Sequence, residues 1–353
     1  MKKIILSIIT MSIFVLSCSK DDDIIITEPL GDYDHGVLVS GEGGPSSVSY
    51  ISYDFSRIEN GIYFKENNES LGVYLQSIGF NDVYAYIVTH NANTINVVNR
   101  YTFEKVGTIS TGLKTPRYIT FLNGKGYVTN WGDGYDATDD FIAVVNLETN
   151  TVESTIPVGE GPEQILADGN KIFVSHKGGY SKNNIVSVIN ATSKDVETIF
   201  VNDNPDEMII NQSGNLVVLS EGATLYDSNW NPIGQTNGAI TKIDVTDNSI
   251  ISTLTLGTGF RPSLMDYNNG KLYYVFSGKV YSLEDSDTTL PTEPIINLTA
   301  SSAYGMAVNN NKLYLTDASF TGQSDLIVYD LISKNELDTF KVGLGASKIY
   351  FNN

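Results

Sequence analysis

The chain has 353 residues and carries 41 acidic against 22 basic side chains, a formal net charge of −19. Such a surface repels phosphate backbones, and no basic stripe offsets it, so we exclude nucleic acid as a partner. Hydrophobic residues make up 41% of the chain, which is ample for a globular core. The apolar residues alternate with period two between Gly, Asn and Asp, a pattern that predicts an all-β protein.

The first 35 residues are predicted to be a signal peptide and a tether. Lys2 and Lys3 precede an apolar run of about 13 residues, shorter than the ~20 that span a bilayer. The sequence around Cys18, the only cysteine, resembles the bacterial lipobox. We expect residues 1–17 to be removed and Cys18 to be lipidated, with residues 18–35 as anchor and tether.

The acidic run Ser19–Asp23 follows the predicted lipidation site. It is most simply a solvated tether that keeps the domain off the membrane. It also resembles the acidic export signal of lipoproteins in Bacteroidetes-type bacteria. That resemblance implies an outer-membrane protein that faces the cell exterior and contacts the membrane through its lipid anchor only.

Residues 36–353 contain a repeat. The stretch Thr115–Gly161 holds four β-rich runs, RYITF, GYVTN, FIAVVN and TVESTIPV, and Asn123-Gly124 suits the tight turn between the first two. Equivalent runs start 41 to 57 residues apart, at Leu75, Pro116, Pro162, Pro205, Pro262, Ala303 and Ala346. A period of about 40–45 residues with four strands is typical of a β-propeller.

The count of repeats predicts one domain of seven four-stranded blades. Ala346 leaves room for one strand, whereas Gly36–Ser40, Ser46–Asp54 and Gly61–Glu66 read as second, third and fourth strands without a first. We therefore expect both chain ends to build one blade that closes the ring and leaves no open sheet edge.

Two further positions recur in the repeat. Three residues after each start stands an apolar side chain, which fits the innermost strand: Ile78, Ile119, Ile165, Met208, Met265, Met306 and Ile349. Most third strands end in Asp or Asn, namely Asp54, Asn99, Asn146, Asn190, Asp244 and Asp330. We interpret these as caps of the next turn rather than as a functional carboxylate ring.

The long loops of this chain point to a binding face. In a propeller, the loops from second to third strands share one face with those that lead into the first strands. The long ones here are Gly41–Pro45, Trp131–Asp140, Lys177–Asn184, Glu221–Gly238 and Ser319–Asp325. Their aromatic side chains either bind a ligand or cap the blades: Trp131, Tyr135, Tyr180, Tyr226, Trp230 and Phe320.

Residues one position after each start should line the channel mouth on this same face. They are Gln76, Arg117, Glu163, Asp206, Ser263, Tyr304 and Ser347. Polar groups that converge over an aromatic-lined concavity form the default ligand site, and hydrogen bonding between blades is the alternative. We expect Trp230 to lean over the mouth and Arg117 to meet a phosphate or carbonyl group of the ligand.

Catalytic and metal motifs are missing from the sequence. His90 and His176 fall on different blades, and a metal site needs three or four converging ligands. Calcium is an alternative at the acidic loop Asp133–Asp140, although its spacing is not that of an EF-hand. No GxSxG, Walker or CxxC motif occurs. We predict a protein that is not an enzyme, without cofactor or metal.

Tyr127–Asn130 reads YVTN, and the repeat around it resembles the YVTN-type (YncE-like) propeller repeat. With the lipobox and the acidic run, the chain resembles surface propeller lipoproteins of Bacteroidetes-type bacteria. Some of these capture cobalamin (vitamin B12) for a TonB-dependent outer-membrane transporter. The stretches SLGVYLQSIGFNDVYAYIVTHN and TFEKVGTISTGLKTPRYITFL resemble that subgroup.

The resemblance implies capture of a small ligand, a corrinoid, with the transporter as partner. A glycan- or protein-binding propeller with the same anchor is the alternative. A lactonase- or quinoprotein-like enzyme is a third, disfavoured by the missing metal ligands.

Overall fold

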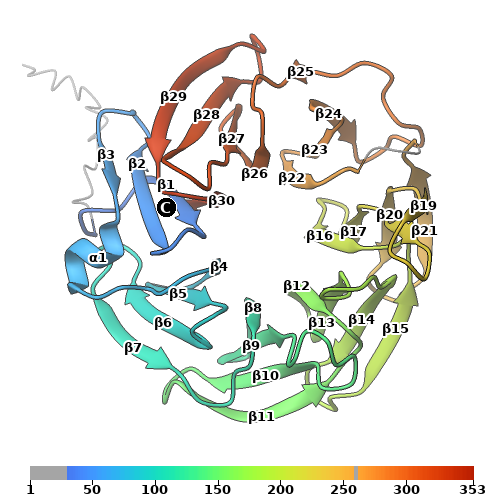
Figure 1. Ribbon diagram of the computed structural model, residues 1–353, viewed down its shortest axis with the longest axis horizontal. Helices are drawn as coiled ribbons and strands as arrows, with labels where there is room; N and C mark the ends of the chain where they lie inside the picture. The colour runs from blue at the N-terminus through green and yellow to red at the C-terminus, as the bar shows by residue number, and fades with distance from the viewer. Residues whose placement is uncertain (1–29, 258–260) are drawn as a thin grey trace, which may run out of the picture.

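The computed structural model describes residues 30–257 and 261–353, which form a ring of blades (Figure 1). Within these residues there are seven four-stranded antiparallel sheets, one two-stranded sheet and one short helix. The predicted all-β, seven-bladed propeller is confirmed. The predicted signal peptide and Cys18 lie outside the described residues, and the described part contains no helix long and apolar enough to cross a membrane.

Both chain ends build blade 1. From the innermost strand outwards it consists of β30 (Ala346–Asn352), β1 (Gly36–Gly41), β2 (Ser47–Ser52) and β3 (Ile58–Asn60). The C-terminal strand β30 runs antiparallel to β1, with Val39 opposite Ile349. Figure 1 shows the red C-terminal strand beside the blue N-terminal ones. The predicted closure of the ring is therefore confirmed.

The other blades follow in chain order, each starting with its innermost strand. Blade 2 comprises β4 (Leu75–Asn81), β5 (Tyr84–Thr89), β6 (Thr94–Asn99) and β7 (Lys105–Ile109). Blade 3 comprises β8 (Pro116–Leu122), β9 (Lys125–Asn130), β10 (Phe141–Asn146) and β11 (Thr151–Pro157). Blade 4 comprises β12 (Pro162–Asp168), β13 (Lys171–His176), β14 (Ile185–Asn190) and β15 (Val196–Phe200).

Blade 5 carries an insertion between its second and third strands. It comprises β16 (Pro205–Ile210), β17 (Asn215–Ser220), β20 (Ala239–Asp244) and β21 (Ile250–Thr255), and the insertion forms a hairpin of β18 (Thr224–Tyr226) and β19 (Pro232–Gln235). Blade 6 comprises β22 (Leu264–Asn268), β23 (Lys271–Phe276), β24 (Lys279–Glu284) and β25 (Ile296–Asn297). Blade 7 comprises β26 (Ala303–Asn309), β27 (Lys312–Asp317), β28 (Ser324–Asp330) and β29 (Glu336–Val342).

Six of the seven predicted blade starts coincide with the first residue of an innermost strand. Blade 6 differs, because β22 begins at Leu264 rather than Pro262. Its regular pairing begins with Leu264 opposite Val275. The tight turn predicted at Asn123-Gly124 is confirmed, with φ angles of 51° and 73°.

The prediction of a strand at Gly61–Glu66 is wrong. This segment forms the helix α1 (Ile62–Asn67), and β3 is the fourth strand of blade 1 instead. Gly61 has a φ of 73°, a left-handed conformation that turns the chain away from the sheet. The helix then buries Ile62 and Tyr63 against the core between blades 1 and 2. Burial of these apolar side chains outweighs the apparent strand pattern.

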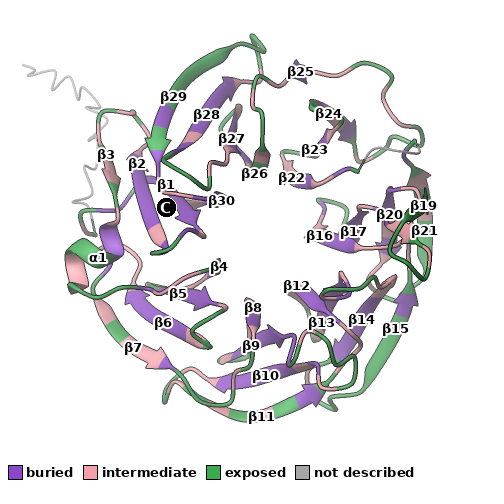
Figure 2. Cartoon of the chain, in the orientation of Figure 1, coloured by how far each residue is buried: buried purple, intermediate pink, exposed green. Residues whose placement is uncertain are grey.

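Apolar clusters between neighbouring blades form the core. One such cluster joins Tyr86 and Val97 of blade 2 to Val128 and Ala143 of blade 3. Figure 2 shows that the middle strands are mostly buried and that the innermost strands mix buried and intermediate residues, whereas outer strands such as β11, β15 and β29 are largely exposed. Most of the stabilising apolar contact therefore lies between blades. The side chains that line the channel can therefore vary without loss of these contacts.

The polar residues at third-strand ends cap turns, as expected. Asn146 accepts hydrogen bonds at its Oδ1 from the backbone N–H groups of Glu148 and Thr149, at 2.9 and 3.1 Å. The same contact to a following backbone N–H is made by Asp54, Asn99, Asn190, Asp244 and Asp330. The structural interpretation of these six residues is confirmed.

Candidate functional site

The channel opens at one end into a mouth of about 150 Å³. Among its lining residues are all those predicted from the position after each blade start: Gln76, Arg117, Glu163, Asp206, Ser263, Tyr304 and Ser347. The strands bring them together because each innermost strand enters the channel from this face. The predicted convergence is therefore found, with one of these side chains from each blade.

Ion pairs link the charged groups of the mouth. Lys177 bridges two blades, with its Nζ 2.6 Å from Asp206 Oδ2 and 3.0 Å from Glu221 Oε1. Lys348 Nζ lies 2.8 Å from Glu207 Oε1. Burial alone would raise the pKa of Asp206, but the ammonium groups of Lys177 and Lys348 outweigh it and hold this pKa below its usual value.

Arg117 has a different environment from the one expected. Its Nη2 and Nε donate to the two carboxylate oxygens of Glu163 at 2.7 and 3.0 Å, and its Nη1 lies 2.9 Å from His90 Nδ1. The guanidinium carbon lies 3.9 Å from the centre of the Trp131 ring. Burial, then the nearby guanidinium, lowers the pKa of His90 to about 4, so this ring is neutral and accepts the bond. Arg117 thus holds the mouth together rather than presenting a free donor fork.

The mouth carries more negative than positive charge. Its lining includes the carboxylates of Glu42, Glu163, Asp206, Glu207 and Glu221 against the cations of Arg117, Lys177 and Lys348. Glu42 accepts a hydrogen bond from the Tyr304 hydroxyl at 3.2 Å, and burial raises its pKa. The site therefore disfavours anionic ligand groups and favours hydrogen-bond donors.

An arc of aromatic rings extends outward from Arg117 of the mouth, and none of its rings lines the mouth itself. Tyr74 contacts His90, His90 contacts Trp131, Trp131 contacts Tyr180, and Tyr180 contacts Tyr135, with ring centres 4.9 to 6.2 Å apart. The outermost two are strongly exposed, Tyr180 at 62% and Tyr135 at 88%. They present flat apolar surface to solvent beside the polar mouth.

A second aromatic contact lies on the Glu42 side. Tyr304 and Phe320 meet edge to face with ring centres 5.7 Å apart. Phe320 and Tyr74 line a small groove of about 240 Å³ together with Glu42. Because Glu42 also lines the mouth, this groove continues the same surface.

Tyr226 and Trp230 lie elsewhere. They sit on the β18–β19 hairpin and contact each other, with ring centres 6.0 Å apart. Trp230 is 79% exposed, and neither residue lines the mouth. In Figure 1 this hairpin lies at the outer rim beside β20 and β21. The expectation that Trp230 leans over the mouth is not met, because the insertion folds into its own hairpin.

The acidic loop between β9 and β10 is held by its own side chains. Asp139 accepts from the backbone N–H of Asp133 and pairs with Lys114 at 2.7 Å. Asp140 accepts from Gly161 N–H at 3.0 Å, and burial raises its pKa to about 7. Across the described residues, no three His, Cys, Asp or Glu side chains are grouped to hold a metal ion.

The sequence matches the model of the domain of unknown function DUF5074 over residues 35–342. The chain belongs to this family. Among curated proteins, none is significantly similar in sequence.

Solved structures of similar fold include other propellers. A putative 6-phosphogluconolactonase from Bacteroides fragilis has a TM-score of 0.64 at 14% identity, over 93% of this chain and all of that one. Apo AztD from Citrobacter koseri has a TM-score of 0.52 at 13% identity, over 89% of this chain and 96% of that one. Hydrazine synthase from Kuenenia stuttgartiensis has a TM-score of 0.54 at 16% identity, over 75% of this chain and 85% of that one. These likenesses show the fold alone.

A second ring of residues in this DUF5074 propeller was predicted only in part, because sequence reasoning named Trp131 as a binding candidate but gave no site role to the others. Glu42, His90, Trp131, Lys177 and Glu221 each directly follow the second strand of a blade. These residues supply partners for the residues one position after the blade starts. Lys177 forms an ion pair with Asp206, and His90 forms a hydrogen bond with Arg117. The repeat could have revealed them, because the second strands were recognised in the sequence.

Proposed function

We propose that this DUF5074 propeller is a surface lipoprotein that captures a ligand at the channel mouth without converting it. The observation that carries the proposal is the mouth itself, where a polar side chain from each blade converges and from which an arc of aromatic rings leads to the exposed Tyr180 and Tyr135. A concave polar centre next to exposed aromatic surface is typical of ligand sites. The lipid anchor at Cys18 would hold this face at the membrane exterior.

The geometry favours a ligand larger than the mouth. A volume of about 150 Å³ is below the range of about 300–1,000 Å³ typical of pockets that enclose a ligand. A ligand would therefore lie across Tyr135 and Tyr180 and insert only a small group into the mouth. The excess of carboxylates favours an inserted group that donates hydrogen bonds, such as an amide.

A corrinoid fits these requirements and is the ligand we propose. Its flat, partly apolar ring suits aromatic contact, and its peripheral amides suit the carboxylates of the mouth. The sequence resemblance to cobalamin-capturing surface propellers points the same way, with a TonB-dependent transporter as the partner that receives the ligand. A glycan shares the need for exposed aromatic rings and hydrogen-bond acceptors, and is the alternative.

Ligand capture is favoured over catalysis by the pairing within the mouth. Each cationic side chain there is neutralised by a carboxylate. His90 bonds to Arg117 rather than to a hydroxyl group, so it is not placed to activate a nucleophile. Such fixed pairs hold a binding surface in one shape.

Calorimetric titration of the purified protein tests the ligand class. We expect cobalamin to bind with a single stoichiometric step and a panel of glycans to give no heat. Binding of a glycan without cobalamin would replace the corrinoid by the alternative. The absence of binding by either would contradict ligand capture as proposed.

A protease test addresses the location. Protease added to intact cells should digest the wild-type protein, and Cys18→Ala should release the protein from the membrane fraction. Protection in intact cells, with digestion only after lysis, would contradict surface exposure.

A further inference from the structure

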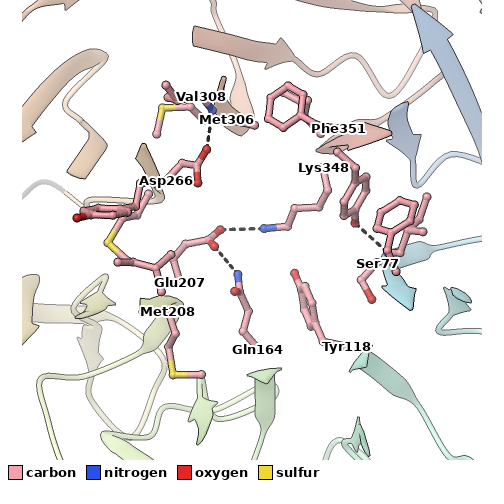
Figure 3. A pocket seen from close by; sticks show the side chains of 18 of the residues that line it. Ser77, Tyr118, Gln164, Glu207, Met208, Asp266, Met306, Val308, Lys348 and Phe351 are labelled. Atoms are coloured by element: carbon pink, nitrogen blue, oxygen red, sulfur yellow. Dashed lines mark hydrogen bonds and ion pairs between the residues drawn. The ribbon is translucent and has the colours of Figure 1, made fainter. Parts of the chain in front are cut away.

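Beyond the mouth, the channel contains a larger cavity of about 510 Å³ (Figure 3). Its wall includes most of the apolar residues found three positions after the blade starts: Ile78, Ile119, Met208, Met265, Met306 and Ile349. The aromatic residues Phe80, Tyr267, Tyr350 and Phe351 extend it toward the opposite face. Both the volume and the mixture of apolar and polar lining residues are those of a site for a small molecule. We call this cavity the chamber.

A layer of polar side chains separates the chamber from the mouth. Lys348 on β30 extends to Glu207 on β16, and Glu207 accepts a hydrogen bond from Gln164 at 2.5 Å. The Lys348 ammonium lies 5.8 Å from the centre of the Tyr118 ring. Figure 3 shows Lys348 and Glu207 pointing toward one another across the channel. Tyr118, Glu207 and Lys348 line both cavities, so a chamber ligand would enter from the opposite face.

Asp266 is one of three charged side chains in the chamber wall, with Glu207 and Lys348. Its Oδ1 accepts from Tyr267 N–H at 2.8 Å and its Oδ2 from Val308 N–H at 2.5 Å. These two bonds fix the carboxylate in place (Figure 3). The ion pairs of the described residues include none with Asp266, whereas Glu207 is neutralised by Lys348. Burial raises the pKa of Asp266 to about 6, as expected for a carboxylate without a nearby cation.

We propose that the chamber binds a small amphipathic amine, a protonated amino group on an apolar or aromatic body. The ammonium would pair with the Asp266 carboxylate, which retains lone pairs beyond those used by the two backbone N–H groups. The apolar body would contact Met208, Met265 and Met306, whose flexible thioethers adapt to varied shapes. A metal ion is a poor occupant, because a single carboxylate cannot supply its ligand set.

The test uses phenethylamine as the probe and phenethyl alcohol as its neutral match. We expect the amine to bind wild-type protein at least tenfold more tightly than the alcohol in calorimetric titrations at pH 7.5. Asp266→Asn, which keeps one acceptor oxygen, should remove this difference. Glu148→Gln, which removes a negative charge from an exposed turn, should preserve it.

A second variant protects the test against misfolding of Asp266→Asn. Met306→Trp fills the chamber while Asp266 stays in place, and it should abolish binding of both probes without lowering the unfolding temperature. Equal affinity of wild type for the amine and the alcohol would overturn the proposal, as would full binding by Met306→Trp.

Discussion

The mouth and the chamber are built by the same seven strands, yet their chemistry differs. One residue after the blade starts, the side chains are polar and of six different types; three residues after, they are Ile or Met throughout. The first position lines the mouth, whereas the second borders the chamber and also packs into the apolar clusters between blades. The comparison teaches that the repeat keeps the positions that support the ring uniform, whereas the positions at the open end vary between blades.

The largest effect should come from β30, which contributes to both regions. Deletion of residues 346–353 removes Lys348, Ile349 and the edge partner of β1. The loss of apolar burial at about 1.5–3 kcal/mol for each large side chain should abolish cooperative unfolding or lower its midpoint strongly. Thermal unfolding followed by circular dichroism measures this. Removal of Asn353 alone is the control, and an unchanged transition after the full deletion would refute closure of the ring by β30.

The polar layer between mouth and chamber should give the next largest effect. Glu207→Ala leaves the partly buried ammonium of Lys348 without its partner, which should cost about 3 kcal/mol of unfolding free energy. Combining it with Lys348→Met should recover most of this loss, since the ammonium left without its Glu207 partner is then removed. Urea unfolding measures both.

An exposed ion pair provides the matched control for this experiment. Lys271 and Glu284 lie 2.8 Å apart with both side chains about half exposed, so Glu284→Ala should change stability by less than about 1 kcal/mol. If Glu207→Ala lowers the free energy of unfolding no more than Glu284→Ala does, Glu207 and Lys348 do not act as a buried ion pair.

The two regions should also differ in their response to pH. Burial raises the pKa of Asp140, in the loop beside the mouth, to about 7, and that of Asp266, in the chamber, to about 6. A carboxyl group with a raised pKa in the folded state is ionised first in the unfolded chain. Its contribution to stability is therefore present at acidic pH and is lost as pH rises toward the folded-state value.

Asp140→Asn and Asp266→Asn separate the two contributions. Asp140→Asn should flatten the decline of stability between about pH 4 and 7, which is at most about 1.4 kcal/mol per pH unit. Asp266→Asn should flatten it only up to about pH 6. Urea unfolding across this pH range checks the sign, and a parallel shift of the wild-type curve by both variants would contradict the raised pKa values.

The sequence predicted the ring well because the fold is a repeat. Blade starts, turn caps and the residues of the mouth all follow from one period, and a repeat allows each position to be compared seven times. The prediction failed in segments that do not belong to the repeat. The helix α1 depends on the left-handed Gly61 and on burial of Tyr63. The position of Trp230 depends on how the insertion folds on itself.

The sequence also did not predict which charged side chains pair with one another. Arg117 was expected to be free for a ligand, but its partners Glu163 and His90 come from blades 4 and 2, at 46 and 27 residues along the chain. Such pairs depend on the distance between neighbouring blades. They become visible only when the ring is assembled.

The most direct test compares two exposed aromatic residues on loops of the same kind. Tyr180 belongs to the arc beside the mouth, whereas Trp230 lies on the outlying hairpin. Cobalamin should be titrated by calorimetry into wild type, Tyr180→Ala and Trp230→Ala. We expect Tyr180→Ala to weaken binding at least tenfold, about 1.4 kcal/mol, and Trp230→Ala to leave it within twofold. A larger loss for Trp230→Ala than for Tyr180→Ala would contradict the placement of the ligand at the mouth.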